Sequence, residues 1–113
     1  MSEPLQLLKK YWKHDHFRTP QEEIIQSVLD GKDTFALLPT GGGKSVCFQI
    51  PALLFDGICL VISPLVALMK DQVQNLQQKN IKAIALTGGI SQDEVIDILD
   101  NCQFGNYKFL YLS

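Results

Sequence analysis

Apolar residues recur along the chain with two different spacings, which separate helical segments from extended ones. Near the start, Leu5, Leu8 and Trp12 follow one another at i, i+3 and i+7. This spacing places the three side chains on one face of a helix, so we predict an amphipathic helix over residues 4–13.

A second helical pattern is bounded by start and stop signals. Thr19 is a good N-cap, Pro20 suits the first helical position, and Glu22 stands where a capping box has its acidic residue. The apolar residues within 24–29 then form one face of the helix. Gly31 is expected to end it in the left-handed conformation.

The rest of the chain alternates short apolar runs with helical patterns. Runs of this length between turn residues are typical of buried strands. The expected strands cover 34–38, 58–62, 81–86 and 108–112, and the expected helices between them cover 44–55, 63–79 and 91–102. Pro51 is expected to kink or end the first of these helices. Ser91 is expected to cap the last one, with Glu94 in the capping-box position.

Strands that alternate with helices predict an α/β fold, here a parallel sheet with helices on both faces that follows two N-terminal helices. Such sheets bind ligands beyond the carboxyl ends of their strands. The loops in which to look for function are therefore 39–43, 63–64 and 87–90.

Composition limits the possible classes of function. The 113 residues are 46% hydrophobic, and ten Lys and Arg against twelve Asp and Glu leave a net charge of −2. A domain that clamps nucleic acid through overall positive charge is therefore excluded, and any such contact must be local. No apolar run reaches the ~18 residues of a membrane span, so no membrane partner is expected. The three scattered cysteines, Cys47, Cys59 and Cys102, indicate buried thiols in a reducing compartment, the cytoplasm.

The strongest chemical signal is the segment Pro39-Thr40-Gly41-Gly42-Gly43-Lys44-Ser45. It follows an expected strand and opens an expected helix, as a phosphate-binding loop does. Glycines let backbone N–H groups turn toward an anion, and the helix N-terminus adds partial positive charge. Lys44 would reach the β- and γ-phosphates, and the Ser45 hydroxyl would bind Mg²⁺. Leu38 stands where the simple motif has its first glycine, so Gly41 is expected to make the turn.

Hydrolysis needs more than a phosphate loop, because a carboxylate must hold Mg²⁺ and another group must orient water. None of the expected strands ends in Asp or Glu, and Asp56 and Asp71 belong to a helix end and a helix interior. The residues alone therefore indicate a nucleotide-binding half-site, and a non-catalytic nucleotide-binding module stays open. A small P-loop kinase is disfavoured, because Arg18 is the single arginine available for a lid.

These motifs resemble the N-terminal part of the RecQ-type DNA helicases of superfamily 2, essentially from end to end. Residues 17–21 resemble the adenine-reading motif 0, and residues 38–45 resemble motif I. Residues 61–73, Val-Ile-Ser-Pro-Leu-Val-Ala-Leu-Met-Lys-Asp-Gln-Val, resemble motif Ia and are the most specific match. Residues 111–113 resemble the opening of the next motif, after which the family has its Asp-Glu-Ala-His box.

The resemblance implies ATP and Mg²⁺ as cofactors. Gln21 would hydrogen-bond the adenine, Arg18 would stack on it, and His14 stands where the family often has a stacking tyrosine. Lys44 and Ser45 would be the catalytic residues, with Ser45 on Mg²⁺. The implied phosphate contacts are Thr40, Gly41, Gly42, Gly43, Lys44 and Ser45.

The resemblance also implies DNA as the partner, single-stranded and at duplex junctions. Ser63 and Pro64 in motif Ia would contact the strand backbone, because a hydroxyl and a helix N-terminus can hold a phosphate. Thr87 has a comparable place after the third expected strand, in a segment that resembles motif Ib. An RNA helicase lobe of the DEAD-box kind is the alternative, and it is less favoured because its motif Ia differs.

The resemblance therefore implies an incomplete P-loop NTPase lobe of the RecA-like kind over residues 1–113. Residues 1–32 would be a helical adenine-recognition segment and 33–113 the start of the sheet. The implied parent enzyme couples ATP hydrolysis to 3′-to-5′ DNA unwinding. Because the catalytic box would follow residue 113, we expect these residues alone to lack ATPase and unwinding activity. We also expect that 34–38 lacks a partner strand.

Overall fold

The computed structural model describes residues 2–38 and 43–113. The chain divides into two compact units, Met1–Asp56 and Gly57–Ser113. Each unit contains its own candidate site.

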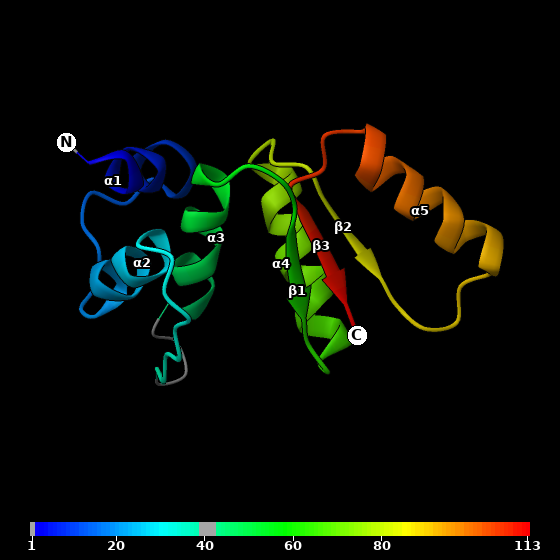
Figure 1. Ribbon diagram of the computed structural model, residues 1–113, viewed down its shortest axis with the longest axis horizontal. Coiled ribbons are helices and arrows are strands. Elements are labelled where there is room, and N and C mark those ends of the chain that lie inside the picture. The colour runs from blue at the N-terminus through cyan, green and yellow to red at the C-terminus, as the bar shows by residue number, and fades with distance from the viewer. Residues whose placement is uncertain (1, 39–42) are drawn as a thin grey trace. The chain divides into compact units, whose positions relative to one another are not determined.

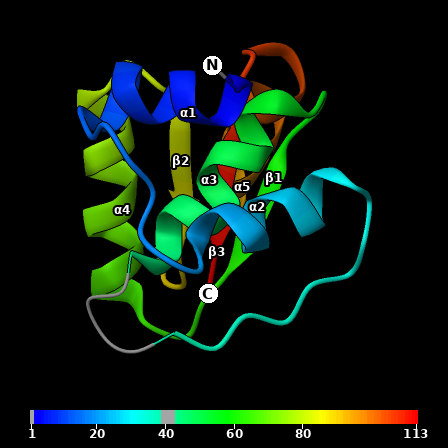
Figure 2. The same cartoon turned by 90° about the vertical axis from the view of Figure 1, so that its left-hand side faces the viewer.

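The first unit is helical in its described part (Figure 2). Its helices are α1 (Glu3–Leu7), η1 (Leu8–Trp12), α2 (Gln21–Leu29) and α3 (Lys44–Leu54). Their apolar faces meet in a core of Leu8, Ile25, Val46 and Ile50. Burying such side chains contributes about 1.5–3 kcal/mol each, which holds η1, α2 and α3 together.

The predicted N-terminal helix is present but changes its winding at its midpoint. Ser2 caps α1, with its Oγ accepting from the Leu5 N–H at 3.4 Å. From Leu8 to Trp12 the helix is of the wider π type, and Lys13 follows in the left-handed conformation at φ 60°. The apolar spacing therefore predicted the helix and its buried face correctly but not the change of winding.

The predicted start of the second helix is wrong. The N-cap of α2 is Pro20 rather than Thr19, and no side-chain hydrogen bond caps the helix there. The reason is a turn in which the Gln21 N–H donates to the Arg18 carbonyl at 2.7 Å. This turn displaces the first helical residue to Gln21. The predicted stop is confirmed, since Gly31 lies at φ 81° just beyond the helix end.

The expected strand 34–38 does not form. Its period is that of a strand, because Thr34, Ala36 and Leu38 line a cavity of about 270 Å³ against α2 and α3. Phe35 and Leu37 point the other way and are 91% and 86% exposed. A strand is stabilised by its neighbours' hydrogen bonds, and the described part of this unit contains no other strand.

Pro51 neither ends α3 nor displaces it from the core. The helix continues for three residues beyond it to Leu54, and the Phe55 N–H donates to the Pro51 carbonyl at 3.2 Å. Pro51 is among the fully buried side chains. Its packing therefore offsets the hydrogen bond that a proline cannot donate.

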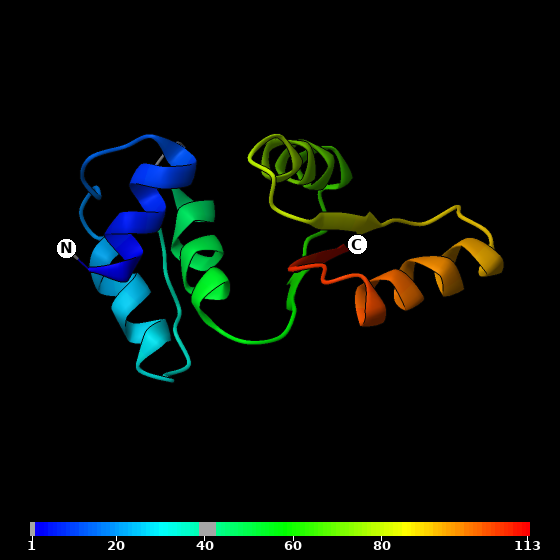
Figure 3. The same cartoon turned by 90° about the horizontal axis from the view of Figure 1, so that it is seen from above.

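The second unit is a three-stranded parallel sheet with a helix on each face (Figures 1 and 3). In chain order it contains β1 (Cys59–Ile62), α4 (Val66–Gln78), β2 (Ala83–Leu86), α5 (Gln92–Phe104) and β3 (Phe109–Leu112). The last strand lies in the middle, in the order β1-β3-β2. The predicted α/β class and parallel sheet are confirmed, and the sheet is open rather than closed.

The two helices cover the sheet unequally. Helix α4 buries Met69, Val73 and Leu76, which recur at helical spacing. Helix α5 buries none of its residues, and its apolar residues Val95, Ile98 and Leu99 are at most half-buried. Its predicted cap is confirmed, because Ser91 Oγ accepts from the Glu94 N–H at 3.2 Å.

Helix α4 starts later than predicted. The residue before it, Leu65, is extended, so the segment 63–65 is a connection rather than the first helical turn. Ser63 Oγ accepts from the Leu65 N–H at 3.2 Å, which forms a local turn ahead of the helix. None of the helices in 2–38 and 43–113 is long and apolar enough to cross a membrane.

Candidate functional site

One buried amide in the first unit joins two segments that the sequence motifs single out. Gln21 is the first residue of α2 and is 5% exposed. Its Oε1 accepts from the Arg18 N–H at 2.8 Å, and its Nε2 donates to the Gly43 carbonyl at 3.1 Å. The turn at Arg18 is thereby tied to the residue that opens α3.

Gly43 is suited to this contact for two reasons. It has φ 74°, a left-handed conformation that favours glycine, and it is the N-cap of α3. A Cβ built on it would collide with Gln21 Nε2. Its carbonyl also accepts a weak hydrogen bond from Cys47 Sγ at 3.8 Å. The approach of the two segments therefore depends on the absence of a side chain at this position.

Helix α3 begins in a way that suits an anion. Lys44 is its first residue and is exposed, and Ser45 follows half-buried. Among the described residues no side chain caps this end. The first N–H groups of a helix carry partial positive charge, so an uncapped end next to a lysine attracts a phosphate. The predicted contacts Thr40, Gly41 and Gly42 lie outside the described residues.

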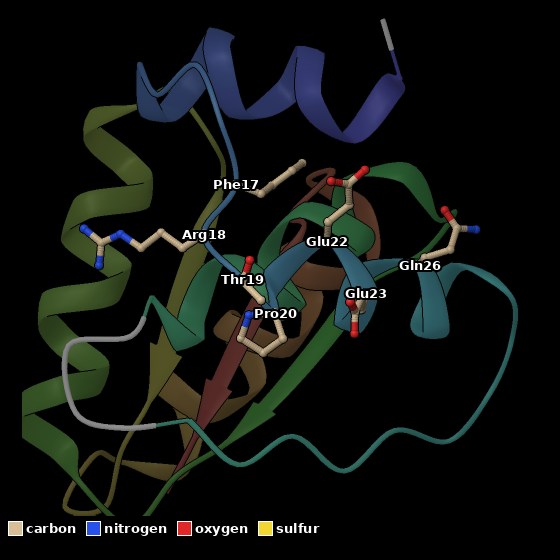
Figure 4. Close-up of a pocket in the computed structure, with 7 residues that line it drawn as sticks. All are labelled: Phe17, Arg18, Thr19, Pro20, Glu22, Glu23 and Gln26. Carbon is tan, nitrogen blue, oxygen red and sulfur yellow. The ribbon is translucent and has the colours of Figure 1, made fainter.

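A pocket of about 340 Å³ lies beside this junction (Figure 4). Its lining residues are Phe17, Arg18, Thr19, Pro20, Glu22, Glu23 and Gln26. Arg18 extends away from the two carboxylates in Figure 4. Two carboxylates repel a phosphate, so this pocket suits a neutral heterocycle better than a phosphate group. His14 is exposed and does not belong to the lining.

Gln21 itself stands behind the pocket lining rather than in it. A primary amide offers two N–H donors and two acceptor lone pairs. The two hydrogen bonds within the chain use one donor and one acceptor. By this count the Gln21 side chain keeps one N–H donor and one acceptor lone pair. A side chain needs one donor and one acceptor to hydrogen-bond the edge of a base.

In the second unit the predicted residues Ser63 and Thr87 fall at one edge of the sheet. Ile62 of β1 and Leu86 of β2 both pair in register with Leu112 of β3. The next residues along these strands are Ser63, Thr87 and Ser113, so three hydroxyl residues follow three aligned strand ends. The Ser63 N–H donates to the Leu112 carbonyl at 2.9 Å, which continues the pairing beyond β1. Pro64 follows and is exposed.

Ser113 is a further candidate, which no sequence motif assigns to a site. The signal is present in the sequence, because the residue that follows each of β1, β2 and β3 is Ser or Thr. What was lacking was the order of the strands, which puts Ser113 between Ser63 and Thr87. The three hydroxyl residues are called the hydroxyl edge below.

The cysteines take no part in either candidate site as reactive groups. Burial raises the pKa of the Cys47, Cys59 and Cys102 thiols, and nearby Lys108 partly opposes this for Cys59. Thiols with raised pKa values stay protonated at neutral pH and react slowly. Cys47 is buried as expected, whereas Cys59 and Cys102 are only half-buried. The described residues contain no cluster of His, Cys, Asp or Glu that could hold a metal ion.

The chain is similar in sequence to known helicases. The sequence profile of the DEAD/DEAH box helicases matches residues 18–110. An ATP-dependent DNA helicase RecQ of Synechocystis is 50% identical over 106 residues, which is 94% of this chain and 22% of that protein. A probable ATP-dependent DNA helicase RecS of Bacillus subtilis is 45% identical over 114 residues, 100% of this chain and 23% of that protein.

A RecQ helicase of Bacillus subtilis is 43% identical over 108 residues and is covered to 18%. The chain thus spans about a fifth of the length of these relatives. The resemblance to RecQ-type helicases that the motifs indicated is confirmed.

Proposed function

The chain belongs to the DEAD/DEAH box helicase family, and from this premise we propose that it is the ATP-binding part of an ATP-dependent DNA helicase. The observation that carries the proposal is the Gln21 bridge between the Arg18 turn and Gly43. It brings a candidate base-reading segment next to the start of a phosphate-binding helix. The relatives RecQ and RecS are both named ATP-dependent DNA helicases, which supports the same activity.

The residues present fit a nucleotide in three places. The pocket beside Arg18 suits the neutral base, with Gln21 behind it able to hydrogen-bond and the Arg18 guanidinium able to stack. The uncapped start of α3 with Lys44 suits the phosphates. The Ser45 hydroxyl suits Mg²⁺, which supplies charge neutralisation on the phosphate oxygens when bound. Thr40, Gly41 and Gly42 would complete the phosphate contacts through their N–H groups.

The hydroxyl edge supports binding of a DNA strand. Hydroxyl groups and N–H groups ahead of a helix hold phosphates and carry no sequence information. Ser63, Pro64 and Thr87 were expected to contact the strand, and Ser113 adds a third hydroxyl in line with them. A row of neutral donors is also compatible with a net charge of −2, because attraction is local. We propose single-stranded DNA, and the single-stranded part of duplex junctions, as the ligand.

ATP hydrolysis by the full-length protein tests the proposal. We expect hydrolysis that rises on addition of single-stranded DNA, and Lys44→Ala should lower the rate at least about a hundredfold, because a cation on the phosphates is lost. Lys32→Ala is the matched control, since Lys32 is another exposed lysine of the same unit. Equal rates for the two variants would refute the phosphate role of Lys44.

The choice between DNA and RNA needs its own measurement. Labelled single strands of one sequence, made as DNA and as RNA, should be titrated with the full-length protein at fixed salt. We expect tighter binding of DNA, weakened by Ser63→Ala. Tighter binding of RNA would instead favour the RNA helicase alternative.

A further inference from the structure

A buried hydrogen bond joins α4 to the central strand just behind the hydroxyl edge. The Tyr111 hydroxyl donates to Gln72 Oε1 at 2.8 Å, and Tyr111 is 1% exposed. Tyr111 lies on β3 two residues before Ser113, with its side chain on the face that α4 covers. Gln72 lies six residues after Val66, about 9 Å along the axis from the start of α4.

This bond does what the apolar contacts of α4 cannot do. Met69, Val73 and Leu76 pack against the sheet, but apolar contacts are non-directional and tolerate a shift of the helix along its axis. A shifted helix would break the hydrogen bond between the Tyr111 hydroxyl and Gln72, and losing a buried hydrogen bond costs stability. The polar pair therefore selects one axial position of α4.

The axial position of α4 decides where its N-terminus meets the hydroxyl edge. At the opposite end, Gln77 Nε2 donates to the Ala83 carbonyl at 2.9 Å and fixes the last turn of α4 to β2. At the strand end, the Ser63 N–H donates to the Leu112 carbonyl. The Tyr111–Gln72 bond lies between these two anchors and is the one nearer the start of the helix.

We propose that Tyr111 and Gln72 are positioning residues for the DNA contact, acting by holding the start of α4 in line with Ser63. This inference rests on the proposed function, because it presumes that the hydroxyl edge binds DNA. A phosphate contact weakens when its donors are displaced, even if every donor is still present. Loss of the bond should therefore weaken DNA binding without removing a DNA ligand.

The central experiment compares KM and kcat in DNA-stimulated ATP hydrolysis by the full-length protein. Tyr111→Phe should raise the single-stranded DNA concentration for half-maximal stimulation about fivefold, the effect of one net hydrogen bond. The rate at saturating DNA and the KM for ATP should stay unchanged. A changed DNA concentration with an unchanged maximal rate would indicate a positioning role. General loss of folded protein would lower the rate at saturating DNA as well.

Two control variants remove similar polar groups at other positions in the second unit. Gln77→Leu removes the other hydrogen bond between a glutamine of α4 and the sheet, at the end far from the hydroxyl edge. Tyr107→Phe removes a tyrosine hydroxyl elsewhere in the unit and keeps the ring beside Lys82, whose Nζ lies 5.8 Å from the ring centre. Neither should alter the DNA concentration for half-maximal stimulation.

A double variant separates stability from positioning. Tyr111→Phe combined with Gln72→Met replaces both polar partners by apolar groups, which restores most of the lost stability. It does not restore a directional contact, so the weakened DNA response should persist while the midpoint of urea unfolding recovers. Recovery of both together would show a purely structural role and would overturn the proposal.

The remaining outcomes are also decisive. An unchanged DNA response in Tyr111→Phe, or an equal change in Gln77→Leu, overturns the positioning role while the proposed function stands. If DNA does not stimulate ATP hydrolysis by the wild-type protein and the protein does not bind DNA, both the positioning role and the proposed function are overturned. A weakened response confined to Tyr111→Phe and the double variant supports the proposal.

Discussion

The contact between Gly43 and Gln21 provides the sharpest test of the structure. Replacing Gly43 with alanine adds one methyl group in front of Gln21 Nε2 at the N-cap of α3. Both the backbone conformation and the space at this position oppose that methyl group. The Gly43→Ala variant should therefore be less stable than a variant in which another glycine of the unit is replaced by alanine.

The magnitude can be assembled from two parts. A left-handed alanine, here at φ 74°, costs about 1 kcal/mol. The methyl group also expels Gln21 Nε2 from its hydrogen bond to the Gly43 carbonyl and leaves a buried donor, which costs about 1–3 kcal/mol. We expect Gly43→Ala to lower the free energy of unfolding by about 2–4 kcal/mol in total.

Gly31→Ala is the matched control. Gly31 lies at φ 81° in the same unit, and a Cβ there would meet nothing within 4 Å. Gly31→Ala therefore has only the cost of the left-handed backbone conformation. The effect of alanine on the unfolded chain is the same for both variants. Equilibrium urea unfolding of the two variants and the wild type gives both differences.

A double-variant cycle completes the test. Gln21→Ala removes the group that the new methyl would strike, so Gly43→Ala should cost about 1 kcal/mol in that background, as Gly31→Ala does. Equal destabilisation by Gly31→Ala and Gly43→Ala in the wild-type background would show that contact with Gln21 adds nothing to the cost at Gly43. An undiminished cost of Gly43→Ala in the Gln21→Ala background would show the same.

Three further predictions concern other parts of the chain. Burial raises the Cys47 pKa above its usual 9.0, so the folded state holds the proton more tightly and stability falls as pH rises above about 9. Urea unfolding across this range should show a shallower fall for Cys47→Ala, and equal slopes would contradict the cause. Ser91→Ala removes the cap of α5 and should cost about 1 kcal/mol of helix stability, seen as faster amide exchange in α5; unchanged exchange would count against the cap. Phe35→Ser should change the free energy of unfolding by less than about 0.5 kcal/mol, because the ring is 91% exposed; a loss near 2 kcal/mol would mean that the ring is packed.

Local signals predicted those elements whose stability is local. The cap at Ser91 and the left-handed stop at Gly31 depend on residues within a few positions, and both are confirmed. The predicted start of α2 was wrong because the turn at Arg18 competes with a cap by Thr19. The predicted strand at 34–38 was wrong because a strand needs hydrogen bonds from a neighbouring strand. The spacing of apolar residues along the chain carries no information about that neighbour.

The candidate sites divide in the same way. The residues of the candidate phosphate-binding segment and the expected helix after it follow from residue type and spacing alone. The Gln21–Gly43 contact joins positions 22 residues apart, and no spacing rule indicated it. Ser113 was overlooked because its relevance depends on β3 lying between β1 and β2.

The α/β alternation, the RecQ-type motifs and the chemistry that each motif offers are therefore properties that local sequence patterns reveal. These depend on neighbours along the chain, through hydrogen bonds within a turn and the period of the apolar residues. The contact between Gln21 and Gly43 and the shared edge of the three hydroxyl residues, in contrast, are seen only in the folded chain. Such features arise where distant segments meet, because burial and strand pairing act between residues that the order of the chain does not bring together.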